Sequence, residues 1–163
     1  MLHLGLKYGT ISTADIASLH SGKRRHIMLK VIFGKRGMGK SRQMCIWANE
    51  RLAAAHGTVV FIDKDTDHMY DLNRDVRFIN ASEYSVCGTD RLLGFISGIA
   101  ARDYDLEALY INSFAKLVDV PAAELEPVLD FLERFSEQTG ADVTIAVNDG
   151  GMPCPDFMRK YIG

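Results

Sequence analysis

The stretch "FGKRGMGKS", residues 33–41, decides the expected fold. It follows the apolar run "IMLKVIF", and from Gly34 to Ser41 it satisfies the pattern G-x-x-x-x-G-K-[ST] of a phosphate-binding loop. Glycines let a backbone wrap around phosphate, while inward-pointing amides and the N-terminus of the next helix favour an anion. The alternative interpretation is a Gly-rich turn with a helix-capping serine. The residues predicted to contact a nucleotide are Gly34, Lys35, Arg36, Gly37, Met38, Gly39, Lys40, Ser41 and Arg42.

Two side chains of this loop have specific expected roles. Lys40 is predicted to reach the β- and γ-phosphates of ATP, where its ammonium would act as a catalytic group by neutralising developing charge. The hydroxyl of Ser41 is predicted to bind Mg²⁺.

Composition predicts one soluble domain of ordinary size. The chain has 163 residues, of which 47% are hydrophobic and 25% charged. A net charge of -2 gives no general reason to expect a nucleic-acid partner. The longest apolar run, near "LLGFISGIAA", has about half the length of a membrane span. The cysteines (Cys45, Cys87 and Cys154) and the histidines are scattered, which favours a reducing cytoplasm over disulfides or a zinc site.

Residues 1–27 differ from the rest of the sequence. They contain a single acid, Asp15, end in the basic cluster "KRRH" and lack the apolar core of a signal peptide. The cluster is typical of a solvated basic turn, and contact with nucleic acid or a membrane surface is the alternative. Either this segment is a leader of the folded protein, or Met28 is the natural start. We expect the nucleotide-binding domain to occupy residues 28–163.

From residue 28 onward the sequence predicts alternating strands and helices. We expect Thr89 or Asp90 to cap the second helix and Gly57 to close the first. Continuous apolar strands separated by amphipathic helices indicate a three-layer α/β fold, with a mostly parallel five-stranded sheet and helices on both faces. The expected strands are 27–33, 58–63, 75–80, 106–112 and 142–148, and the expected helices are 40–56, 89–103, 121–139 and 154–162.

Three downstream segments resemble the core of RecA/DnaB-type ATPases, so that the resemblance covers about residues 28–149. "VVFIDKDTDH" resembles the second core strand, and "EALYINSFAKL" resembles the Walker B strand. "DFLERFSEQTGADVTIAVND" resembles the helix and strand that follow it. The resemblance implies a small P-loop ATPase domain that uses ATP and Mg²⁺. It also implies that Asn148, at the end of the last strand, senses the γ-phosphate, although a satisfied polar strand end is the alternative.

One residue departs from the RecA/DnaB pattern. Asn112 stands where the family has the Walker B aspartate, whose charge helps to hold Mg²⁺ through bound water. An asparagine keeps an acceptor but loses the charge, and such losses typically cost about 10–100-fold in metal affinity or activity. One interpretation is that the domain binds nucleotide without efficient hydrolysis. The other is that a different carboxylate serves the metal.

The acidic segment "FIDKDTD" is the expected source of that carboxylate. Asp63 is predicted as a metal-side residue at the end of a strand beside the P-loop strand. Asp65 matches the RecA glutamate in position, so the resemblance implies that it orients the attacking water as a catalytic residue. The alternative is that Asp63, Asp65 and Asp67 form a solvated acidic turn. Ser113 is expected to pack rather than to contact Mg²⁺.

The second position of the loop carries a further resemblance. Lys35 resembles the lysine in the variant loop of MinD/ParA-type ATPases, which reaches the nucleotide of the partner subunit in an ATP-bound dimer. Arg36 replaces the second glycine of that family. The alternative is a solvated lysine.

Three function classes remain open from the sequence. The first is a RecA-like ATPase or ATP-dependent switch acting with a macromolecular partner or as a homo-oligomer. The second is a regulatory domain that binds nucleotide without hydrolysing it. The third is a small-molecule kinase of the nucleoside type, which ranks last because the sequence shows no acceptor-binding insertion or arginine-rich lid.

Overall fold

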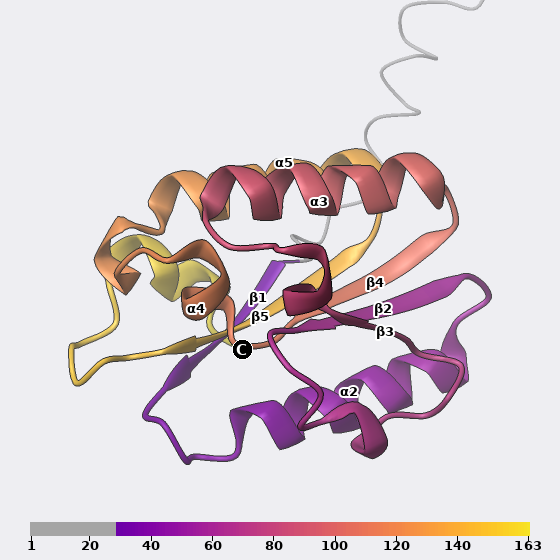
Figure 1. Ribbon diagram of the computed structural model, residues 1–163. Coiled ribbons are helices and arrows are strands. Elements are labelled where there is room, and N and C mark those ends of the chain that lie inside the picture. Colours follow the sequence, from indigo (N-terminus) through magenta and orange to yellow (C-terminus); the bar gives the residue numbers. More distant parts are fainter. Residues whose placement is uncertain (1–28) are drawn as a thin grey trace, which may run out of the picture.

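A sheet of five parallel strands forms the middle layer of the fold (Figure 1). The computed structural model describes residues 29–163, so the expected leader 1–27 and the start of the strand expected at 27–33 lie outside the described residues. The strand order is β1-β5-β4-β2-β3. The strands are β1 (Leu29–Gly34), β2 (Thr58–Asp63), β3 (Arg77–Asn80), β4 (Leu106–Ile111) and β5 (Asp142–Asn148).

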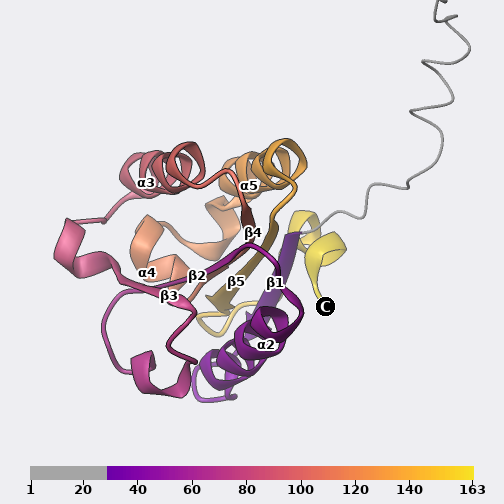
Figure 2. The ribbon, with the colours of Figure 1, turned by 90° about the vertical axis from the view of Figure 1, so that its right-hand side faces the viewer.

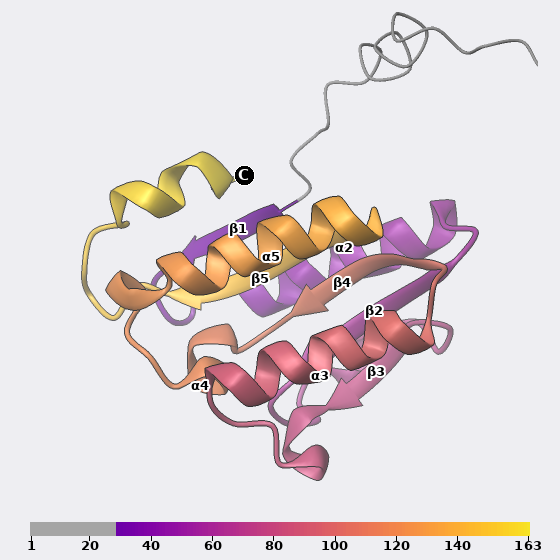
Figure 3. The same ribbon diagram turned by 90° about the horizontal axis from the view of Figure 1, so that it is seen from above.

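Helices cover both faces of this sheet, as Figures 2 and 3 show. On one face lies α2 (Lys40–Ala54), which packs through buried Met44 and Ala48. The opposite face carries α3 (Thr89–Arg102), α4 (Phe114–Val118) and α5 (Glu126–Thr139). The apolar side chains of each helix therefore face the sheet, which confirms the predicted three-layer α/β architecture.

The expected elements are present, with several changes at their ends. The first helix ends at Ala54, and the chain is already extended at Ala55, so Gly57 does not close it. Gly88 rather than Thr89 or Asp90 occupies the N-cap of α3. The helix expected at 121–139 begins as α5 only at Glu126, after a separate 3₁₀ turn at Ala122–Glu124. Pro127 fits there because backbone N–H groups in the first turn of a helix have no intrahelical acceptor. A proline, which has no N–H, therefore loses no helical hydrogen bond at this position.

Two further segments complete the described chain. The short helix α4, which follows β4 directly, was not expected, because five residues are too few to show a helical period. A terminal 3₁₀ helix, Asp156–Tyr161, packs beside β1, and Ile162 forms a parallel bridge with Val31. Between residues 29 and 163, no helix has both the length and the apolar character needed to cross a membrane.

Strand register brings the important side chains to one edge of the sheet. Ile62 of β2 pairs with Ile111 of β4, so Asp63 and Asn112, the next residues, lie side by side at the carboxyl ends of these strands. Gly34, where the loop begins, pairs with Asn148 of β5 in the same way. The expectation that the strand of Asp63 lies beside the P-loop strand is wrong, because β5 and β4 separate β2 from β1.

Candidate functional site

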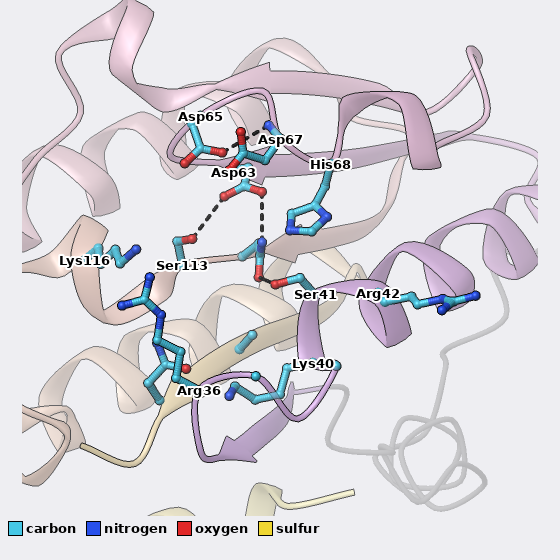
Figure 4. A pocket seen from close by; sticks show the side chains of 15 residues that line it. Arg36, Lys40, Ser41, Arg42, Asp63, Asp65, Asp67, His68, Ser113 and Lys116 are labelled. Atoms are coloured by element: carbon cyan, nitrogen blue, oxygen red, sulfur yellow. Dashed lines mark hydrogen bonds between the residues drawn. The ribbon is translucent and has the colours of Figure 1, made fainter. Parts of the chain in front are cut away.

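An open pocket of about 380 Å³ lies at this carboxyl edge (Figure 4). In open α/β sheets this edge is the usual place for a ligand. The pocket is lined mainly by polar and charged side chains from the loop after β1, the segments after β2 and β4, and the end of β5. Its lining residues are Arg36, Gly37, Gly39, Lys40, Ser41, Arg42, Asp63, Asp65, Asp67, His68, Asn112, Ser113, Lys116, Ala146 and Asn148.

The loop after β1 has a backbone that requires glycine at two positions. Gly37 and Gly39 have φ angles of 86° and 81°, a left-handed conformation that other residues rarely adopt. A Cβ atom at either position would meet nothing within 4 Å, so the space beside the loop is open. The turn thus leads into α2 with room for a ligand beside its backbone, as a phosphate cradle requires.

Lys40, the first residue of α2, folds back over this loop. Its Nζ donates hydrogen bonds to the carbonyl oxygens of Gly34, at 2.9 Å, and Lys35, at 2.6 Å. Partial burial lowers the pKa of Lys40, while the negative charge of Asp149 acts in the opposite direction. The ammonium therefore lies across the loop, where it can exchange carbonyl oxygens for phosphate oxygens.

A chain of hydrogen bonds joins Ser41 to the two neighbouring strands (Figure 4). The Ser41 hydroxyl donates to Oδ1 of Asn112 at 3.0 Å. The amide nitrogen of Asn112 donates in turn to Oδ2 of Asp63 at 2.8 Å. Asn112 thus connects the predicted Mg²⁺-binding hydroxyl with a carboxylate, and it does so through both ends of its amide group.

Asp63 is a buried carboxylate that accepts hydrogen bonds from three donors. Only 1% of the residue is exposed, and its Oδ1 accepts hydrogen bonds from the backbone N–H of Lys64 at 2.7 Å and from the hydroxyl of Ser113 at 3.1 Å. Burial raises the pKa of Asp63, and the hydrogen bonds from Asn112, Lys64 and Ser113 act against this rise. Because a buried negative charge is costly without a counter-charge, a cation bound nearby would stabilise the ionised form of Asp63.

Ser113 has a more specific place than the expected packing role. It adopts a left-handed backbone conformation, with φ 54° and ψ 31°, between β4 and α4. For a residue other than glycine this conformation is unfavourable, and such strain is often found at functional sites. Here it turns the chain sharply after Asn112, so that the Ser113 hydroxyl reaches Asp63.

Two ionisable pocket residues were not predicted from the sequence. His68 lies in the segment after β2, and Lys116 lies in α4. Figure 4 shows Lys116 and Arg36 on one side of the pocket, whereas Arg42 extends away from the cluster around Asp63. The sequence feature that could have indicated His68 and Lys116 is their position shortly after the carboxyl end of a parallel strand.

The remaining predicted residues divide into two groups. Asp65 and Asp67 line the pocket, but Oδ1 of Asp65 accepts a hydrogen bond from the backbone of Asp67 at 3.1 Å, as in a solvated acidic turn. Asn148 lines it from β5. Gly34, Lys35 and Met38 are not among its lining residues, although the carbonyls of the first two bind Lys40.

The residues of this pocket fit a magnesium nucleotide. Mg²⁺ prefers oxygen ligands and usually keeps several waters, binding few protein groups directly. The Ser41 hydroxyl, the buried Asp63 carboxylate and the Asn112 amide between them supply oxygen atoms at one end of the pocket. Cationic side chains and the open loop backbone supply partners for phosphate at the other.

Comparison with known proteins adds a fold neighbour. No model of a protein family matches the chain, and no curated protein matches its sequence. Among solved structures, the flagellar accessory protein FlaH from Methanocaldococcus jannaschii is similar over 85% of this chain and 69% of its own, with a TM-score of 0.53 and 17% sequence identity. At that identity the similarity concerns the fold alone. It agrees with the three-layer α/β architecture and fits the fold expected from the RecA/DnaB resemblance.

Proposed function

We propose that the protein binds ATP with Mg²⁺ in the pocket around the loop 34–41 and acts as a RecA-like ATPase or ATP-dependent switch. The observation that carries the proposal is the hydrogen-bonded chain from Ser41 through Asn112 to Asp63. It supplies, beside a phosphate-binding loop, the carboxylate that Asn112 itself lacks.

Each side chain has a distinct part in the proposed site. Lys40 binds the β- and γ-phosphates after leaving its two carbonyl partners. Ser41 would hold the metal, and the negative charge of Asp63, kept in place by Asn112, would act on it through bound water. When bound, Mg²⁺ neutralises phosphate charge.

Hydrolysis requires a water molecule aligned with the γ-phosphate. Asp65 is our candidate for orienting it, because its carboxylate lines the same pocket and follows the strand end of Asp63 by two residues. Arg36 and Lys116 add positive charge on the pocket wall. Such preorganised charges are the main means of catalysis in phosphoryl transfer.

We assign Lys35 a role in the proposed oligomer, where it would reach the nucleotide of a second subunit. Lys35 is exposed and lies outside the pocket lining, so its ammonium is free to reach toward another subunit, as the MinD/ParA resemblance implies. A change in apparent mass upon addition of Mg²⁺-ATP, absent in Lys35→Ala, would support this part of the proposal. A monomer at every nucleotide concentration would remove it.

A calorimetric titration of the protein with Mg²⁺-ATP tests the central proposal. We expect Mg²⁺-dependent binding that falls by about 10–100-fold in Lys40→Ala, since hydrogen bonds to charged groups contribute about 1.5–3 kcal/mol. Lys64→Ala removes the same charge from an exposed residue outside the pocket lining and serves as the matched control. Absence of binding, or unchanged binding by Lys40→Ala, would contradict the proposal.

Phosphate release then separates the function classes. Steady release without an added acceptor supports an ATPase, and its loss in Asp65→Asn would support the role of Asp65. Binding without release supports the second class, a regulatory domain that binds nucleotide without hydrolysing it. Phosphate transfer that appears only with a nucleoside acceptor would support the kinase instead.

A further inference from the structure

Three metal-ligating side chains meet on the side of the loop helix, outside the hydrogen-bonded chain around Asp63. Cys45 belongs to α2, whereas His68 and Asp71 belong to the segment between β2 and β3. One ligand atom of each residue lies within 4.8 Å of those of the other two. No sequence pattern indicates this site, because Cys45 lies more than twenty residues before His68 and Asp71.

The backbone holds these side chains together independently of any cation. Asn49 lies one helical turn after Cys45, and its Nδ2 donates to the carbonyl oxygen of Asp71 at 2.9 Å. Its Oδ1 accepts from the backbone N–H of Asn73 at 2.8 Å. Both amide ends of Asn49 therefore fasten the segment 68–73 to α2, which Figures 1 and 2 show lying side by side.

The three ligand types indicate which cation would bind. A thiolate, an imidazole and a carboxylate together are typical of Zn²⁺, whereas Mg²⁺ prefers oxygen alone. With Zn–S of about 2.3 Å and Zn–N or Zn–O of about 2.0–2.2 Å, tetrahedral ligand atoms lie closer than 4.8 Å. A small closure of half-buried His68 and exposed Asp71 onto Cys45 would complete the geometry.

We propose that Cys45, His68 and Asp71 bind a Zn²⁺ ion that fastens the segment 64–71 to the helix of the phosphate-binding loop. Three protein ligands leave a fourth position for water. Nδ1 of His68 lies 3.3 Å from the acceptor Oδ2 of Asp71, so two of the ligands are already close together.

Zinc binding at this place has two consequences. Burial raises the pKa of the Cys45 thiol to about 11, so the bound thiolate forms only when its proton is released to solvent, and affinity rises with pH. Asp65, Asp67 and His68 also line the phosphate pocket, so the ion would restrict the segment that forms one of its walls. This inference goes beyond the proposed nucleotide function and does not depend on it.

Cobalt(II) titration of the reduced protein tests the site directly. A thiolate ligand to Co²⁺ gives an intense sulfur-to-metal charge-transfer band in the near ultraviolet, which oxygen ligands of the phosphate pocket cannot give. We expect this band at one equivalent, its displacement by Zn²⁺, and its loss in Cys45→Ala. Cys87→Ala, which removes an exposed cysteine, is the matched control and should keep the band.

Further variants make the test decisive if Cys45→Ala does not fold. His68→Ala and Asp71→Ala change partly exposed residues and should each lower Zn²⁺ affinity at least about tenfold, measured by competition with a chromogenic chelator. Lys40→Ala should bind Zn²⁺ like the unchanged protein, so failure of the nucleotide proposal would not imitate failure of this one. No charge-transfer band, a band that requires Cys87, or unchanged affinity in His68→Ala and Asp71→Ala would overturn the proposal.

Discussion

The amide nitrogen of Asn112 lies 2.8 Å from Oδ2 of Asp63. Both residues are buried, with 3% of Asn112 and 1% of Asp63 exposed to solvent. The pair contains one negative charge, carried by β2 instead of β4. A carboxylate at position 112 would face a second carboxylate, and two like charges at that distance cannot both ionise without a large cost. Asn112 is therefore complementary to Asp63.

This complementarity predicts a reciprocal effect of two substitutions. Asn112→Asp alone should lower the free energy of unfolding by about 1–3 kcal/mol in Mg²⁺-free buffer, because a buried hydrogen bond becomes a repulsive contact. Adding Asp63→Asn should recover most of this loss, since the amide and the carboxylate have exchanged places. Urea unfolding of the four proteins in the cycle measures the coupling. Additive effects would show that the two side chains do not form a pair in solution.

Asp63→Asn by itself should change how stability depends on pH. Because burial raises the pKa of Asp63, the native state holds this proton more tightly than the unfolded chain. The contribution of Asp63 to the free energy of unfolding therefore declines as pH rises from the usual carboxyl pKa, about 3.9, through the raised native value. In the variant this decline should be weaker.

The two proteins are compared by the slope of the free energy of unfolding against pH, and not by its absolute value. The substitution also alters the hydrogen bonds with Lys64 and Ser113, which changes the absolute value. Urea unfolding without Mg²⁺, at a series of pH values from about 4 to 8, gives both curves. The variant should gain stability relative to the unchanged protein as pH rises. Parallel curves would mean that Asp63 titrates as an ordinary exposed carboxyl group. The same variant should bind Mg²⁺-ATP more weakly.

The loop and the two polar positions could be predicted, but their pairing could not. The motif from Gly34 to Ser41 is local, so one short stretch contains its chemistry. The sequence predicts Asp63 and Asn112 as polar strand ends, but as alternative partners of the metal, and it places β2 beside β1. Only the sheet order, which depends on packing across the whole core, makes them neighbours.

The missed residues have a similar physical cause. Lys116 lies in α4, whose five residues are too few for a periodic pattern. His68 enters the pocket because the segment after β2 folds back onto α2, through contacts of Asn49 with Asp71 and Asn73. Those contacts join residues more than twenty positions apart, and no local pattern encodes them.

Gly57 should prove essential for stability, although it does not end a helix. A Cβ atom at this position would lie 2.0 Å from the backbone oxygen of Asp105. The chain is held there by the N–H of Gly57, which donates to Oε1 of Glu107 at 2.6 Å, and by the N–H of Thr58, which donates to that Asp105 oxygen at 2.9 Å. Gly57→Ala should therefore lower the free energy of unfolding by about 1–3 kcal/mol.

The matched control for Gly57 is Gly98→Ala. Gly98 lies inside α3, and a Cβ atom there would meet nothing within 4 Å. Replacing a glycine in a helix interior should add about 0.5–1 kcal/mol. Denaturant unfolding of both variants measures the difference in sign, and equal effects would contradict the close approach of Gly57 to Asp105.

Lys116 should help the pocket to distinguish ATP from ADP. Its exposed ammonium belongs to α4, directly after the strand of Asn112, and lines the pocket on the same side as Arg36. A γ-phosphate bound between Lys40 and this wall would gain a second cation, worth about 1.5–3 kcal/mol as a charged hydrogen bond. Lys116→Ala should therefore weaken binding of Mg²⁺-ATP by about 10–100-fold and of Mg²⁺-ADP much less. Calorimetric titration with both nucleotides measures the ratio, with Lys64→Ala as the control for loss of one positive charge. An equal loss for ATP and ADP would instead mean that Lys116 acts on the pocket as a whole and not on the terminal phosphate.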